Sequence, residues 1–170
     1  YLLMGIAALS TLASNGLIFH LVGYSVTNLA VFLVIIIVYN STKKEEIVDF
    51  AGLAERAPFV AMALSVGLFS LAGLPFFAGF TTKFYLFTAV ADQGLLWLVG
   101  LAITNSLISL YYYLMIVKQM YMHSYTGSDT VEVSRLNGAV LWILVMGIVA
   151  IGIYPGPLVK AIEAATAAIL

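Results

Sequence analysis

Residues 71–83 read LAGLPFFAGFTTK, and this stretch decides how the chain folds. It lies inside an apolar segment, residues 57–92, whose only internal charge is Lys83. A straight helix over that segment would be about 54 Å long at about 1.5 Å per residue, whereas the hydrocarbon core of a bilayer is about 30 Å thick. Pro75 removes a backbone hydrogen bond, and the neighbouring glycines loosen the backbone. The stretch therefore predicts either one broken span or two short spans that meet at Pro75.

The composition of the chain favours a lipid environment. Hydrophobic residues make up 63% of its 170 residues, charged residues make up only 9%, and the mean hydropathy is +1.09. A soluble domain carries roughly 25% charged residues, and a chain of this length cannot bury so much apolar surface in its own core. The sequence therefore predicts an all-helical, polytopic transmembrane bundle that forms a single domain, and it excludes a soluble globular enzyme.

Charge and cysteine content exclude several other classes of protein. The formal net charge is −1, which supplies no basic field for nucleic acid. The chain has no cysteine, which excludes disulfides, thiolate metal sites and iron–sulfur ligation. Neither a glycine-rich phosphate loop nor an HExxH motif is present. We therefore expect no cofactor and no metal in this chain, and no nucleic-acid partner.

Further apolar segments are long enough to cross a bilayer, which takes about 20 residues; they are residues 16–40, 95–121 and 137–154. The opening run, residues 1–9, is too short to cross and lacks the basic region of a signal peptide. We therefore expect the chain to begin partway through a longer protein. A polar turn is expected at residues 10–15, and a short amphipathic helix at residues 158–170.

The distribution of lysine and arginine distinguishes one broken span from two short ones. The charged loops, residues 41–56 and residues 119–137 with Lys118 at the edge, carry lysine and arginine, whereas the short turns between the other spans carry none. If residues 57–92 cross once, both basic loops lie on the same side of the membrane, in agreement with the positive-inside rule. If they cross twice, the two loops lie on opposite sides. The pattern therefore favours one broken span, interrupted around residues 73–80.

Lys83 is the first candidate functional residue. A lysine in the middle of a span is costly unless it faces protein or water, and such residues mark ion or proton pathways. Lys83 also follows a helix break, and non-helical backbone at membrane depth is tolerated only where protein buries it or where it lines a wet cavity. The alternative is a lysine near a span end whose side chain reaches up to the lipid headgroups.

A polar face on the span 16–40 supplies the second candidate, His20. Tyr24, Thr27 and Asn28 follow it at helical spacing, so these side chains share one face of a helix. An imidazole can accept and donate a proton at once, which suits a proton relay. The alternative is a neutral histidine that forms hydrogen bonds between packed helices.

The span 95–121 has a similar polar face. Asn105, Ser109 and Tyr112, with Tyr113 beside them, lie at helical spacing. These side chains either hold water beside Lys83 or form hydrogen bonds to neighbouring helices.

Three motifs carry a resemblance to a known family. Residues 71–87, LAGLPFFAGFTTKFYLF, resemble the LAGLPPxAGFxGKFYLF signature of the antiporter-like membrane subunits of respiratory complex I, the proton-pumping NADH:quinone oxidoreductase. Residues 109–118, SLYYYLMIVK, resemble the SxYYYLxxxK run of its N-subunit type, and residues 24–32, YSVTNLAVF, look like the YxxTNLGAF stretch of that type. The sequence departs from the signature at Phe76, where proline is common, and at Thr82, where glycine is common.

The resemblance implies a fold and a role for Lys83. Subunits of this family contain two inverted repeats of transmembrane helices, each with a discontinuous helix, and this chain would be the second repeat plus the C-terminal helix. Lys83 matches the lysine of the second broken helix, which belongs to the output half of a proton channel. Thr82 would line the same channel, together with the polar faces around His20 and Asn105.

The resemblance also implies a setting. The chain would be one subunit of a proton-translocating oxidoreductase without a redox centre of its own, because NAD, FMN, the iron–sulfur clusters and quinone belong to other subunits. Its partners would be the other membrane-arm subunits and the lipid bilayer. We expect it in the inner (plasma) membrane of a bacterium, with a thylakoid or another energy-transducing membrane as the alternative.

Two other functions remain open at this point. The same fold occurs in multisubunit cation/proton antiporters and in membrane-bound hydrogenases, where sodium can be the coupled ion. The chain could also be a structural subunit that seals the membrane arm without conducting protons.

Overall fold

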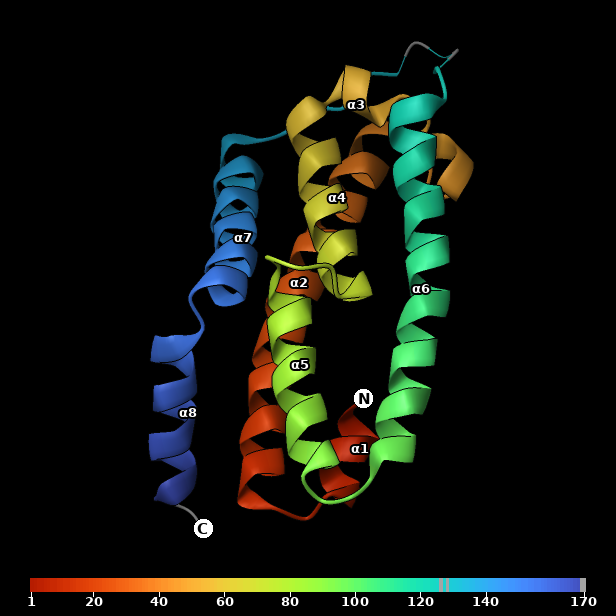
Figure 1. Cartoon of the computed structure of the whole chain (residues 1–170). Coiled ribbons are helices and arrows are strands. Elements are labelled where there is room, and N and C mark those ends of the chain that lie inside the picture. Colours follow the sequence, from red (N-terminus) through yellow and green to blue (C-terminus); the bar gives the residue numbers. More distant parts are fainter. Residues whose placement is uncertain (126, 128, 169–170) are drawn as a thin grey trace.

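The computed structural model describes residues 1–125, 127 and 129–168, and every regular element in this part of the chain is helical (Figure 1). This result confirms the predicted all-helical fold class. In chain order the elements are α1 (Leu2–Ala7), α2 (Thr11–Thr42), the 3-10 turn η1 (Ile47–Phe50), α3 (Leu53–Arg56), α4 (Pro58–Ala72), α5 (Ala78–Ala91), α6 (Leu96–Met122), α7 (Arg135–Ile153) and α8 (Gly156–Ala167).

Among the described residues, α2, α6 and α7 are each long and apolar enough to cross a membrane. They contain nearly all of the three uninterrupted spans predicted from the sequence. The polar turn expected at residues 10–15 is wrong for most of its length, because α2 already begins at Thr11. Ser10 is the N-cap, and its hydroxyl accepts a hydrogen bond from the Ala13 amide at 3.1 Å. A serine in this position starts a helix by pairing with a free backbone N–H group.

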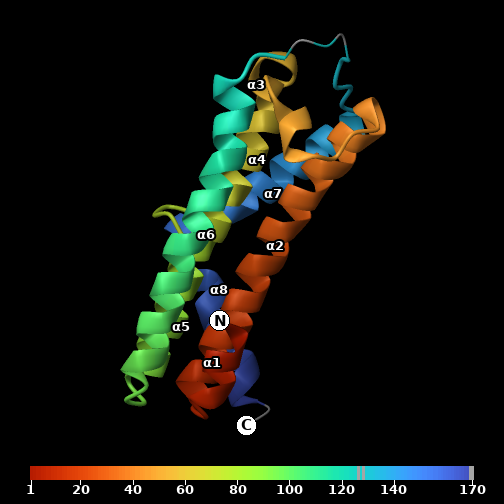
Figure 2. The ribbon, with the colours of Figure 1, turned by 90° about the vertical axis from the view of Figure 1, so that its right-hand side faces the viewer.

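The predicted broken span is present as α4 and α5, which lie end to end beside α2 in both views (Figures 1 and 2). Gly73 ends α4 in the left-handed conformation, with a φ of +85°, which is the usual way for a glycine to close a helix. The interruption covers residues 73–77, and α5 begins at Ala78. The break is therefore slightly shorter than predicted from the sequence, since Gly79 lies within the first turn of α5.

A second interruption separates α7 from α8, and α8 lies below α7 in both views (Figures 1 and 2). The expected amphipathic helix at residues 158–170 corresponds to α8, which begins two residues earlier because Pro157 is well placed in the first turn of a helix. Ile162 and Thr166 are its buried residues. Residues 169 and 170 lie outside the described part of the chain.

The apolar core runs along the middle of the bundle. Its larger part joins α2, α4 and α7, and a smaller part joins α1, α2, α5 and α6. Helix α6 is the least covered of the long helices, with only Ala102 and Met120 buried. Most of α6 is therefore open to its surroundings, apart from Ala102, which packs against α5, and Met120.

Charged side chains gather at one end of the bundle, outside the helices that cross. Lys44 pairs with Asp129 at 2.8 Å, and the Tyr125 hydroxyl donates to the same carboxylate at 2.6 Å. These contacts lower the pKa of Asp129 and raise the pKa of Lys44. They connect the loop after α2 to the loop after α6 across this end of the bundle.

Candidate functional site

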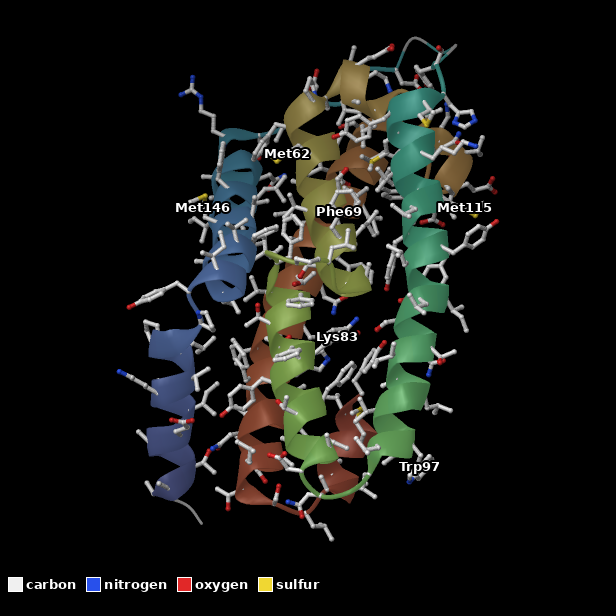
Figure 3. All side chains as sticks on the ribbon, viewed as in Figure 1. Met62, Phe69, Lys83, Trp97, Met115 and Met146 are labelled. Atoms are coloured by element: carbon white, nitrogen blue, oxygen red, sulfur yellow. The ribbon has the colours of Figure 1, made fainter. Side chains whose placement is uncertain are left out.

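Lys83 lies in the second turn of α5 and is only 7% exposed. Figure 3 shows its side chain in the interior of the bundle, between α5 and α6. Its ammonium Nζ donates to the Leu71 carbonyl at 2.8 Å and to the Ser106 hydroxyl at 3.4 Å. It also lies 4.6 Å from the centre of the Tyr1 ring, a cation–π distance. The side chain therefore ends among protein groups next to the helix break.

The break explains why the lysine is held there. Helix α4 ends at Ala72, so the carbonyl of Leu71 has no partner within its own helix. In a membrane such a carbonyl must find a donor inside the protein, and the Lys83 ammonium supplies one. Gly73 is favoured here by its φ of +85° rather than by space, since a Cβ at that position would lie 3.4 Å from Nζ, an ordinary contact distance.

The partners of Lys83 are all neutral. Between residues 1 and 168, leaving aside 126 and 128, the one ion pair joins Lys44 to Asp129 in the loops. Lys83 thus has a carbonyl, a hydroxyl and an aromatic ring around its charge, and no carboxylate. A neutral partner does not hold the proton as a carboxylate would, because no buried anion is left behind when the proton departs.

A cavity of about 280 Å³ lies beside Lys83. It brings together eight of the residues predicted from the sequence: Lys83, His20, Tyr24, Thr27, Asn105, Ser109, Tyr112 and Tyr113. The two polar faces identified in the sequence, on α2 and on α6, therefore meet across the same space. With water in it, this cavity would provide a connected set of donors and acceptors next to the ammonium group.

The other two predicted residues lie outside this cavity. Thr82 is fully buried, and its hydroxyl lies 3.1 Å from Nδ1 of His20, so it orients the imidazole. Asn28 donates its side-chain amide to the Tyr24 carbonyl at 3.0 Å on the same helix. Thr82 thus acts on the cavity only through its contact with His20, whereas Asn28 makes a contact within α2.

The sequence did not reveal the role of Ser70. Its hydroxyl accepts a hydrogen bond from the Gly79 amide at 3.0 Å and lies 3.0 Å from the Thr27 hydroxyl. The Gly79 amide is one of the unpaired donors at the start of α5, so Ser70 satisfies a group that the break leaves free. The position of Ser70 in the last turn before the glycine and proline was the available signal.

Ser106 was also missed, although it follows Asn105 directly. Its hydroxyl lies 2.6 Å from the hydroxyl of Tyr1 and receives the weaker hydrogen bond from Lys83. It belongs to a second cavity of about 330 Å³, which is lined mainly by apolar side chains of α5 and α6. Lys83 lines both cavities, so its side chain stands between a polar space and an apolar one.

Comparison with known proteins gives one family and a consistent set of relatives. The family described as "NADH:quinone oxidoreductase/Mrp antiporter, TM" matches residues 1–109. NADH-quinone oxidoreductase subunit N of Desulfitobacterium hafniense is 43% identical over 147 residues, which cover 86% of this chain and 29% of the relative. The subunit N of a Paenibacillus species is 36% identical over 169 residues, covering 96% of this chain and 32% of the relative. The chain thus spans about a third of the length of these curated relatives.

Solved structures show the same fold. A chain of the Mrp complex from a Dietzia species superposes with a TM-score of 0.86 at 22% identity, covering 98% of this chain and 40% of that one. A chain of the archaeal membrane-bound sulfane sulfur reductase gives 0.83 at 26% identity, with 92% and 32% covered. A chain of respiratory complex I from Thermus thermophilus gives 0.77 at 22% identity, with 94% and 42% covered.

Proposed function

The chain belongs to the NADH:quinone oxidoreductase/Mrp antiporter membrane family, and from this premise we propose that it translocates protons as part of a complex I subunit N. The names of its curated relatives support this choice of subunit. Within that subunit it would be the second of two inverted repeats plus the C-terminal helix. Its partners would be the other membrane-arm subunits in a bacterial plasma membrane, and NAD, FMN, the iron–sulfur clusters and quinone would be bound by those other subunits.

The observation that carries this proposal is the contact between Lys83 Nζ and the Leu71 carbonyl, 2.8 Å long and beside a polar cavity. A charged lysine donates three hydrogen bonds, and a neutral lysine still has two N–H groups for the carbonyl. The side chain can therefore stay in place while it loses a proton to water and takes up another. This property suits a group that passes protons and remains at one position.

The transfer would proceed through the polar cavity. Water there accepts a proton from the Lys83 ammonium or returns one to the neutral amine, with Asn105, Ser109 and Tyr112 orienting the water from α6. His20, held by Thr82, is placed to relay protons along the wall formed by α2. A positive charge that arrives nearby would favour release of the proton from Lys83, because like charges repel each other more strongly inside the protein than in bulk water. Redox chemistry in other subunits would supply that charge.

Replacement of Lys83 in the intact complex tests the proposal. Lys83→Met keeps a flexible side chain of similar length but cannot carry a proton, so we expect fewer protons moved per electron while electron transfer continues. Lys118→Met is the matched control, because Lys118 is an exposed lysine near the end of α6. An unchanged ratio of protons to electrons in Lys83→Met would remove Lys83 from the path.

The likeness to the Mrp complex keeps cation/proton exchange as the second candidate function. The two functions differ in the ion that is required. Transport by the purified complex that depends on sodium, and that stops when sodium is replaced by choline, would favour exchange. Transport that is equal in both salts would favour a proton pump.

A further inference from the structure

Helices α7 and α8 hold α5 through hydrogen bonds to a face of α5 other than the one that carries Lys83. Thr81 and Tyr85 lie four residues apart and so share one face of the helix, whereas Lys83, midway between them in sequence, points to a different face. The Thr81 hydroxyl donates to the Gly152 carbonyl in the last turn of α7 at 2.8 Å. The Tyr85 hydroxyl donates to the Glu163 carboxylate of α8 at 3.2 Å. Two polar contacts thus hold α5 just before and just after Lys83.

The first of these contacts joins the two helix interruptions. Helix α7 ends at Ile153, so the Gly152 carbonyl lacks a partner in its own helix and accepts the Thr81 hydrogen bond instead. Gly152 also packs directly against the loop of the other interruption, since a Cβ at this position would overlap the Phe76 carbonyl oxygen. Phe76 has a φ of +74°, a conformation that a bulky residue rarely adopts. The two interruptions therefore contact each other through backbone atoms.

The second contact forms at the interface of α8 with α2 and α5. Ile162 and Thr166 of α8 are buried. Asn15 of α2 is only 8% exposed, and its amide oxygen has no hydrogen-bond partner among the described residues. Asn15 and Tyr85 line the same narrow gap against α8. Hydrogen bonds between side chains of different helices add to the van der Waals packing that holds those helices together.

We propose that the α7–α8 unit positions Lys83 for proton transfer, with Thr81, Gly152, Tyr85 and Glu163 as positioning residues. This inference rests on the function proposed above, and it adds the residues that determine the position of Lys83. The Lys83–Leu71 hydrogen bond is short, and a displacement of α5 by about 1 Å takes it beyond hydrogen-bonding distance. A movement of α8 that shifts α5 by this amount would therefore break the hydrogen bond between Lys83 and Leu71.

The test uses the intact complex in liposomes and measures protons moved per electron. Thr81→Val keeps the shape of the side chain but removes the donor, and Gly152→Ala pushes the two interruptions apart. We expect each to lower the ratio at least halfway to the value found for Lys83→Met, with electron transfer preserved. Thr81→Ser restores the hydroxyl and should restore the ratio, which a general loss of packing would not explain.

Matched controls separate positioning from folding. Thr88→Val removes a hydroxyl of α5 that bonds only to carbonyls of its own helix, so it should leave the ratio unchanged. Tyr85→Phe removes only the hydroxyl that donates to Glu163, and it serves where Gly152→Ala fails to assemble. In a chain that already carries Lys83→Met, Thr81→Val should have no further effect on pumping.

The outcomes are distinguishable. Normal pumping in both Thr81→Val and Tyr85→Phe, alongside lost pumping in Lys83→Met, would overturn the positioning role and leave the proposed function standing. Normal pumping in Lys83→Met would overturn both. A lowered ratio in Thr81→Val that Thr81→Ser does not restore would also contradict the positioning role.

Discussion

At the scale of the residue, Lys83 is a buried cation whose neighbours carry no negative charge. Its nearest partner is a backbone carbonyl that became available when α4 ended. A carbonyl accepts a hydrogen bond from the charged and from the neutral amine, so the partner does not oppose release of the proton. The sequence singled out Lys83 as a candidate functional residue from its place after Gly73 and Pro75, and this role stays a prediction. It did not predict the partner, because a backbone acceptor leaves no mark in the amino-acid pattern.

Replacing Lys83 with arginine separates charge from proton exchange. A guanidinium stays protonated under all ordinary conditions, so Lys83→Arg keeps the charge but loses the ability to release a proton. We expect an assembled complex whose ratio of protons to electrons is as low as that of Lys83→Met. The measurement is proton uptake by liposomes at a known rate of NADH oxidation. Normal pumping in Lys83→Arg would mean that a fixed charge is sufficient at this position.

At the scale of the element, polar side chains satisfy the backbone groups that the interruption between α4 and α5 leaves free. Lys83 of α5 donates to the Leu71 carbonyl of α4, and Ser70 of α4 accepts from the Gly79 amide of α5. Gly73 and Pro75 were enough to predict the break, whereas the single crossing was predicted from the distribution of lysine and arginine in the loops. The prediction of a turn at residues 10–15 was wrong because Ser10 acts as a cap and the residues after it are helical. The sequence predicted that the last span ends at residue 154, close to the end of α7 at Ile153, but it did not predict that α8 lies below α7 (Figure 1). The position of one helix relative to another depends on contacts between residues that are distant in the sequence.

The role of Ser70 at this break gives a second prediction. Ser70→Ala leaves the Gly79 amide without its acceptor in a buried place, which costs about 1–3 kcal/mol. We expect the subunit that carries Ser70→Ala to unfold at a lower temperature than the unaltered subunit when the purified complex is heated. Ser65→Ala is the control, because the Ser65 hydroxyl only donates to the Ala61 carbonyl of its own helix. Equal effects of the two substitutions would argue against a special role of Ser70.

At the scale of the whole molecule, the chain is an open bundle. Helix α6 has few buried residues, and the polar cavity is bounded on that side by Asn105 and Tyr112, both of them exposed. The curated relatives are about three times as long as this chain. We expect the remaining helices of such a subunit to cover α6 and complete the channel. Composition predicted the membrane bundle correctly, but a single sequence gives no direct signal for which faces remain open.

Because residues 1–170 contain no cysteine, an introduced thiol can test whether the cavity holds water. Asn105→Cys places the only thiol of the chain at the cavity wall, where water allows it to ionise and react with a small charged methanethiosulfonate. Leu144→Cys, on α7 and packed against the apolar core, is the control and should not react. We expect Asn105→Cys in the intact complex to be labelled at least about ten times faster than Leu144→Cys. The thiolate is the reactive form of cysteine, and apolar surroundings suppress its formation. Equal and negligible rates would show that the cavity is dry.

The most direct test of proton transfer through Lys83 is the number of protons moved per electron by the reconstituted complex carrying Lys83→Met. We predict that this number falls while NADH oxidation continues, and that Lys118→Met leaves it unchanged. The same number of protons per electron in Lys83→Met and in the unaltered complex would contradict a role of Lys83 in the proton path.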